Sequence, residues 1–181
     1  MKRIFFILVV VLIPSVVLAD WDGPHRRHSF PTSFPAGHEA DGRTLYISQC
    51  VHRDQTFSTD LPYYSTSNRG WHIGKAGTHL SKGMTFSWGG SEYDSDHCRR
   101  DEHWVYLADD GATYRWVAQS GGAYPTGAVK GYNGSEQHHI CRVNFQGGVH
   151  PGKLIPSSNA CFIGWGGREH GIQNYEVLVK D

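Results

Sequence analysis

The stretch that decides the fold runs from residue 151 to residue 178 and reads PGKLIPSSNACFIGWGGREHGIQNYEVL. Three parts of it stand out, and an earlier part of the chain repeats them in the same order. They are Gly152-Lys153, the corner Trp165-Gly166-Gly167-Arg168-Glu169, and the aromatic segment Tyr175-Glu176-Val177-Leu178. A repeat of this kind shows how a fold is built before any local feature does.

The earlier copy begins with Gly74-Lys75 and continues with Trp88-Gly89-Gly90-Ser91-Glu92 at nearly the same spacing. Its closing segment is Trp104-Val105-Tyr106-Leu107. The first copy also holds an extra polar stretch, residues 55–70, which we interpret as an inserted surface loop. The sequence therefore predicts two halves that fold alike.

Composition favours strands over helices. The chain has 22 glycines, 6 tryptophans, 9 tyrosines and 8 phenylalanines but only 2 methionines, and aromatic residues between glycine turns are typical of β-structure. No window shows helical periodicity. We predict an all-β fold, a pseudo-twofold β-sandwich, with strands at residues 44–50, 84–88, 103–108, 113–118, 139–143, 161–165 and 174–179.

The first residues are typical of a secretory signal peptide. A basic Lys2-Arg3 precedes an apolar run over residues 4–13, and a small residue, Ala19, stands at the expected cut. The alternative is a membrane anchor, but the run is shorter than the roughly 20 apolar residues that a spanning helix needs. We expect a secreted, extracellular protein without membrane insertion. The predicted boundaries are 1–19 for the signal, 20–34 for an N-terminal arm or strand, 35–108 for repeat 1, and 109–181 for repeat 2 with its connecting strand, the two repeats forming one compact domain.

The formal net charge is +0. No basic field exists to attract nucleic acid or an anionic membrane surface, so we expect neither as a partner. Twelve histidines invite a metal reading, but no Cys-x-x-Cys or His-Glu-x-x-His pattern is present. Asp94-Ser95-Asp96 resembles the start of a calcium loop without its later ligands. With no Gly-x-Ser-x-Gly nucleophile either, we expect no metal, no cofactor and no enzymatic activity.

Four cysteines remain after the predicted cut, namely Cys50, Cys98, Cys141 and Cys161. In an exported chain they allow two disulfides and three pairings. Our hypothesis is one pair per repeat, Cys50 with Cys98 and Cys141 with Cys161. The alternative is that some stay free as small buried hydrophobic residues.

The second copy resembles the DM9 repeat. The resemblance lies in four segments, and the first copy keeps a degenerate form of them. In the second copy they are Ile140-Cys141-Arg142, Pro151-Gly152-Lys153, Gly166 to His170 and Tyr175 to Leu178; in the first copy they are Asp41-Gly42, Tyr46-Ile47, Gly74-Lys75 and Gly89 to Glu92.

The resemblance implies a function. Tandem DM9 proteins include secreted or cell-associated immune lectins that recognise mannose, and some form homodimers through N-terminal strands. Their sugar site pairs an Asp in an Asp-Gly turn with the Lys of Gly-Lys. On this chain the pattern falls on Asp41 with Lys75, and on Asn133 with Lys153. The expected partner is therefore a mannose-type glycan, and the expected role is pattern recognition in innate immunity.

The chemistry of such a pair suits a sugar, because a carboxylate accepts hydroxyl protons and an ammonium group donates to hydroxyl lone pairs. The alternatives are an ordinary turn residue for Asp41 and solvated surface amines for Lys75 and Lys153. Asn133 lacks the charge, and Asn133-Gly134-Ser135 is an N-glycosylation sequon. We therefore expect one working site rather than two.

Glu92 and Glu169 follow the Gly-Gly corners. Either they point into the clefts of the two predicted sugar sites or they accept backbone N–H bonds at the corner. Local side-chain to backbone hydrogen bonding, which is common at turns, favours the second alternative. Trp88 and Trp165 are expected in the core of each half. The competing hypothesis for function is a secreted protein-interaction or toxin-like DM9 scaffold that binds no sugar.

Overall fold

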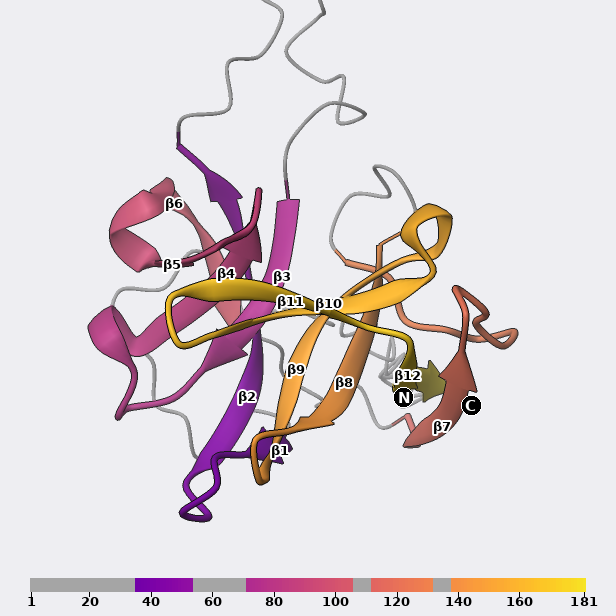
Figure 1. Ribbon diagram of the computed structural model, residues 1–181. Coiled ribbons are helices and arrows are strands. Elements are labelled where there is room, and N and C mark those ends of the chain that lie inside the picture. Colours follow the sequence, from indigo (N-terminus) through magenta and orange to yellow (C-terminus); the bar gives the residue numbers. More distant parts are fainter. Residues whose placement is uncertain (1–34, 54–70, 106–111, 132–137) are drawn as a thin grey trace, which may run out of the picture.

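The computed structural model describes residues 35–53, 71–105, 112–131 and 138–181 (Figure 1). This part of the chain is all-β, as predicted, and contains only one-turn 3₁₀ segments besides its strands. None of its helical segments is long and apolar enough to cross a membrane. The strands are β1 (Pro35–His38), β2 (Thr44–His52), β3 (Trp71–Ala76), β4 (Met84–Trp88), β5 (Ser91–Asp94), β6 (Cys98–Val105), β7 (Tyr114–Ser120), β8 (His139–Phe145), β9 (Gly148–Ile155), β10 (Ala160–Trp165), β11 (Arg168–Ile172) and β12 (Asn174–Lys180).

All strand pairs are antiparallel, in the order β1-β2-β3-β4-β5-β11-β10-β9-β8-β12-β7, with β6 beside β2. Because β1 also pairs with β9, the path from β1 to β9 closes on itself, while β8, β12 and β7 extend beyond it (Figure 1). Two runs of neighbouring strands, β2 to β5 and β8 to β11, meet where β5 pairs with β11. This closure brings β3 and β9 close together.

The Gly-Gly corners are tight hairpin turns. Gly89 and Gly90 have φ of 57° and 87°, and Gly166 and Gly167 have φ of 61° and 80°. Positive φ at both central residues defines the turn that matches the twist of a two-residue hairpin, and glycine adopts it without steric cost. Each corner therefore folds a strand directly onto the next one, β4 onto β5 and β10 onto β11.

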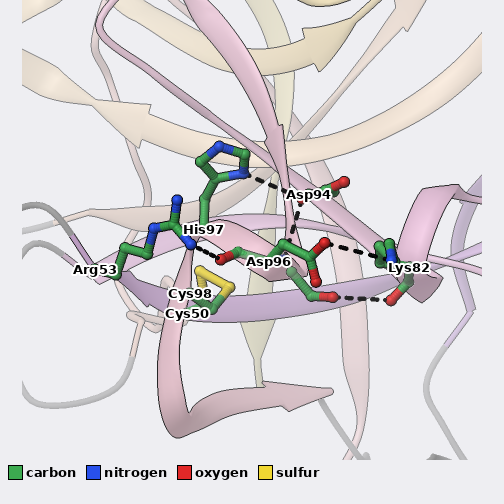
Figure 2. Close-up of a disulfide and its surroundings, with 8 residues drawn as sticks. Cys50, Arg53, Lys82, Asp94, Asp96, His97 and Cys98 are labelled. Atoms are coloured by element: carbon green, nitrogen blue, oxygen red, sulfur yellow. Dashed lines mark hydrogen bonds and ion pairs between the residues drawn. A yellow bond between two sulfur atoms is a disulfide. The ribbon is translucent and has the colours of Figure 1, made fainter.

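The core contains both disulfides, and their pairing confirms the hypothesis of one bond per repeat. Cys50 is joined to Cys98 and Cys141 to Cys161, and no described cysteine is free. Figure 2 shows the first of them, which links β2 to β6. Around each bond the core is formed by aliphatic and aromatic side chains, including Met84 and Phe86 near the first, and Val143, Leu154, Ile163 and Val177 near the second.

The expectation that Trp88 and Trp165 lie in the core is wrong. Their exposed fractions are 36% and 37%, because each tryptophan is the last residue of its strand and stands next to a hairpin turn. One edge of each ring still packs, Trp88 against the ring of His52 at 4.7 Å and Trp165 against that of Phe145 at 5.7 Å. The tryptophans therefore mark the rims of the two hairpins.

Several sequence predictions concern residues outside the described ranges. They are the signal peptide, the arm over residues 20–34, the loop over residues 55–70, the site residue and glycosylation sequon at Asn133, and part of the strand predicted at 103–108. The other predicted strands all appear. The strand at 84–88 has its predicted bounds, and each of the others is longer or shifted by one or more residues at an end. The strands β1, β3, β5, β9 and β11 were not predicted as such. Their polar residues and glycines hide the strand pattern.

Candidate functional site

Each Gly-Lys pair lies inside a buried strand, so the alternative that the two lysines are solvated surface amines is wrong. Lys75 is in β3 and Lys153 is in β9, with exposed fractions of 4% and 2%. The glycines allow a close approach by the neighbouring strand. A Cβ on Gly74 would stand 2.1 Å from the carbonyl oxygen of Thr85, and one on Gly152 would stand 2.1 Å from that of Phe162. Glycine in a strand interior is typical of such contacts.

Lys75 lies between two carboxylates. Its Nζ atom is 3.6 Å from Oε1 of Glu39, in the turn between β1 and β2, and 3.6 Å from Oε1 of Glu92, on β5. Two histidines face Glu39 as well. Nε2 of His79 is 3.8 Å from its Oε1, and Nδ1 of His150 is 3.9 Å from its Oε2. We call these five residues the Lys75 cluster.

The contacts of the Lys75 ammonium group are longer than hydrogen bonds, for which 2.7–3.2 Å is typical. Within the described part of the chain, the Nζ atom makes ion pairs only. An ammonium group has three N–H donors. The cluster thus holds a buried cation whose donors are not taken up by short bonds, beside carboxylates that are 17% and 13% exposed.

Lys153 is bound differently. Its Nζ atom is 3.1 Å from Oε1 of Glu169 and 3.3 Å from Nδ1 of His72, and it also donates to the carbonyl oxygen of Ser87. These three acceptors match its three donors. Burial, and then the charge of Lys153, hold the pKa of His72 well below its ordinary value, so this ring is neutral and accepts the bond. The Lys153 site is closed by the protein's own groups.

Glu92 and Glu169 connect the two hairpins, and each accepts a backbone N–H bond at a corner, as the second of the two alternatives predicted. Oε2 of Glu92 accepts the Gly167 N–H at 3.0 Å, and Oε2 of Glu169 accepts the Gly90 N–H at 3.0 Å. Each glutamate therefore caps the corner of the other hairpin while its second oxygen faces a lysine. For Glu169, burial raises the pKa, but the charge of Lys153 and these hydrogen bonds outweigh it and leave the pKa below its ordinary value.

The structure does not join Asp41 to Lys75 directly. The Asp41 carboxylate is 54% exposed, forms an ion pair with Arg43 at 2.7 Å and accepts hydrogen bonds from Nε and N of the same residue. These hydrogen bonds lower its pKa. No ion pair links Asp41 with Lys75 in the described ranges. Asp41 is therefore not one of the Lys75 cluster residues, and Asn133 is outside the described residues.

Sequence reasoning missed Glu39 and the histidines. A signal for the histidines was present, because His72 and His150 each stand three residues before the lysine of their strand, in a His-x-Gly-Lys pattern. His72 accepts a hydrogen bond from Lys153 of the other strand. His150 faces Glu39, which also faces Lys75, and burial and then the charge of Lys75 lower the pKa of His150. No spacing rule relates residues on two strands that meet only through the closure of the sheet.

The Asp94-Ser95-Asp96 segment forms a turn. Asp94 Oδ1 accepts the Asp96 N–H at 3.1 Å and faces Nδ1 of His97 at 3.1 Å (Figure 2). The described residues include no group of three or more His, Cys, Asp or Glu side chains arranged to hold a metal ion. The Asp94 carboxylate is thus used as a cap for the 3₁₀ segment Ser95–His97.

The buried histidines predict a loss of stability in mild acid. Burial is the largest cause of the lowered pKa of His72, His139 and His150. A group with a lowered histidine pKa binds fewer protons folded than unfolded, so stability falls as pH drops through about 6.5. Each such histidine contributes a slope of at most about 1.4 kcal/mol per pH unit. Urea unfolding between pH 8 and pH 5 measures this, and a flat stability curve over that range would contradict it.

A comparison with known protein families gives a match in the C-terminal part of the chain. The fold is all-β, and its site is a set of lysine–glutamate clusters at paired hairpins. The model of the DM9 repeat matches residues 132–181, which span β8 to β12. This C-terminal part of the chain is therefore similar to a DM9 repeat. A search of curated proteins found no match.

Proposed function

We propose that this protein is a secreted, lectin-like carbohydrate-binding protein that binds mannose-type glycans at the Lys75 cluster, and that it is not an enzyme. The observation that carries the proposal is the spacing around Lys75, where the ammonium group is 3.6 Å from each of two carboxylates. The competing proposal, a protein-interaction or toxin-like DM9 scaffold, has no specific contact in its favour.

A sugar hydroxyl suits this spacing. Such a hydroxyl can accept a hydrogen bond from the Lys75 ammonium group and donate one to Glu39 or Glu92, which would replace one long ion pair by two short charged hydrogen bonds. Hydrogen bonds to charged groups contribute roughly 1.5–3 kcal/mol each. Glu39 is the better acceptor at this site than Asp41, because Arg43 already engages both oxygens of Asp41.

We assign the sugar to Lys75 and not to Lys153. The three donors of Lys153 already have three acceptors within the protein, so a hydroxyl would have to displace one of them. Glu39 provides the difference between the sites, because it stands between Lys75 and His150 while Lys153 reaches His72 directly. We therefore still propose one working site rather than two. The reason is that the donors of Lys153 already have acceptors, and not the charge or glycosylation of Asn133.

The wider proposal follows the family resemblance. We propose that the first half is a diverged repeat and that the two halves form a pseudo-twofold sandwich. In support, Lys75 and Lys153, the two hairpin corners, and Glu92 and Glu169 occupy matching places. Disulfides persist in oxidising compartments, which supports secretion. A homodimer would raise the avidity of a weak single-ring site, as a role in innate recognition requires.

Replacing Glu39 by glutamine is expected to weaken mannose binding about tenfold with the fold intact, because a neutral acceptor forms a weaker hydrogen bond than a carboxylate. Asp41→Ala is expected to have a smaller effect. Isothermal titration with mannose, and a glycan array at high ligand density, measure both variants. Asp96→Asn is the matched control, since that carboxylate is 60% exposed and paired with Lys82 away from the cluster.

Two results would reject the proposal. The first is that the wild-type protein binds no sugar at any density. The second is that Glu39→Gln and Asp96→Asn bind mannose alike. Binding to a protein receptor without competition by sugars would favour the scaffold hypothesis instead.

A further inference from the structure

A shallow groove lies on the part of the sheet that extends beyond the closed path. Its volume is about 610 Å³, and its residues come from the neighbouring strands β7, β12 and β8. Ala118 is the cross-strand partner of Glu176, which in turn is the partner of Arg142. Cross-strand partners project from the same face of a sheet. The small side chains of Ala118 and Ser120, beside longer ones on β12 and β8, leave this face hollow.

An ion pair forms the fixed part of the groove. Nε of Arg142 donates to Oε2 of Glu176 at 2.6 Å, and its Nη1 donates to the carbonyl oxygen of Ala36 at 3.2 Å. The guanidinium group also stacks over the ring of Trp116, 4.3 Å from its centroid. A guanidinium group held on three sides loses little freedom when a ligand binds. The opposite charges of Arg142 and Glu176 neutralise each other, so the groove favours a neutral ligand over a charged one.

The groove also carries hydrogen-bonding groups that the protein leaves unused. Asn144, Asn174 and Ser120 are exposed and project from the same face as the ion pair. Within the described part of the chain, no hydrogen bond engages their side chains. Each amide offers two donors and an acceptor oxygen, and the hydroxyl offers one donor and two lone pairs. Neutral donors and acceptors thus surround a rigid charged pair.

We infer that this groove is a second carbohydrate site that takes one neutral polyhydroxylated ring, such as the terminal hexose of a glycan. Three features favour this ligand. The volume lies within the roughly 300–1,000 Å³ of small-molecule sites, the donors and acceptors are mixed as in a hydroxyl array, and large exposed apolar side chains are absent from the groove lining. The ligand class rests on the proposed function, but none of the groove residues belongs to the Lys75 cluster.

The two sites are separable by NMR on the full-length protein with ¹⁵N label, titrated in turn with mannose, galactose and N-acetylglucosamine. With at least one of these sugars, we expect shifts of the backbone amides at residues 118–120 and 174–176. With mannose, the amides at residues 74–76 and of Glu92 should shift as well. The double variant Asn144→Ala/Asn174→Ala should weaken the groove response about tenfold, since it removes two neutral hydrogen bonds. Gln173→Ala, which alters an exposed amide outside the groove, is the control.

Each outcome decides one of the two proposals. If the amides at 74–76 respond and those of the groove do not, the groove inference is overturned and the proposed function stands. If only the groove responds, and Glu39→Gln changes nothing, the assignment of mannose to Lys75 is overturned. A groove response that the double variant leaves at wild-type strength also overturns the groove site, and a protein that responds to no sugar contradicts both.

Discussion

Replacing Lys153 with methionine is expected to lower the free energy of unfolding by about 3–5 kcal/mol, the range seen when one partner of a buried ion pair is removed. The methionine keeps much of the side-chain volume but leaves Glu169 without its cation. It also leaves the His72 Nδ1 atom and the Ser87 carbonyl oxygen without their donor. The loss is large because these acceptors are buried and no water can replace the ammonium group.

Urea unfolding at pH 7 measures this effect, with Lys82→Met as the matched control. Lys82 is 57% exposed and lies 3.4 Å from Asp96, and exposed pairs of this kind contribute at most about 1 kcal/mol. Adding Glu169→Gln to Lys153→Met should recover part of the loss, because it removes the unpaired charge. If the two lysine variants lose similar stability, the buried contacts of Lys153 do not stabilise the fold more than an exposed ion pair does.

Removing the disulfide between Cys50 and Cys98 is expected to cost about 4 kcal/mol, and removing the one between Cys141 and Cys161 about 3 kcal/mol. The bonds close segments with sequence separations of 48 and 20 residues, and a crosslink across a longer segment removes more entropy from the unfolded chain. The first bond also joins β6, which pairs only with β2 among the described strands, to the rest of the sheet.

Double alanine variants of each pair, unfolded in urea without reductant, test this order. Alanine leaves a small cavity in both cases, so the comparison between the two variants isolates the crosslink. Equal losses, or a larger loss at Cys141 and Cys161, would show that native packing around the sulfur atoms outweighs the effect on the unfolded chain.

The two lysine sites show how one residue changes the use of a repeated motif. In the closed site, the histidine of the neighbouring strand reaches the lysine; in the open one, Glu39 stands between Lys75 and His150. Glu39 lies on the turn that leads from β1 into β2, and two backbone hydrogen bonds, Glu39 N to Arg43 O and Gly42 N to Glu39 O, hold that turn. The residue on this short turn is therefore the reason why one lysine site is structural and the other is a candidate binding site.

Patterns local to one segment were predictable from the sequence. The aromatic residues between glycine turns, and the Gly-Gly dipeptides after Trp88 and Trp165, identified an all-β chain with tight hairpins. The repeat suggested how to divide the cysteines between the halves, and the structure confirms that pairing. The prediction that the two tryptophans lie in the core was wrong, because local patterns did not show that each of them is the last residue of its strand.

By itself, the sequence determined the β-class, the hairpin corners and the lysines and glutamates that repeat, since backbone propensity and residue spacing act over a few positions. Only the tertiary structure decided which acids face which amines. Pairing of β1 with β9 and of β5 with β11 brings Glu39 to Lys75 and His72 to Lys153. Such contacts depend on how a sheet closes, and closure is a property of all its strands together, which no single segment encodes.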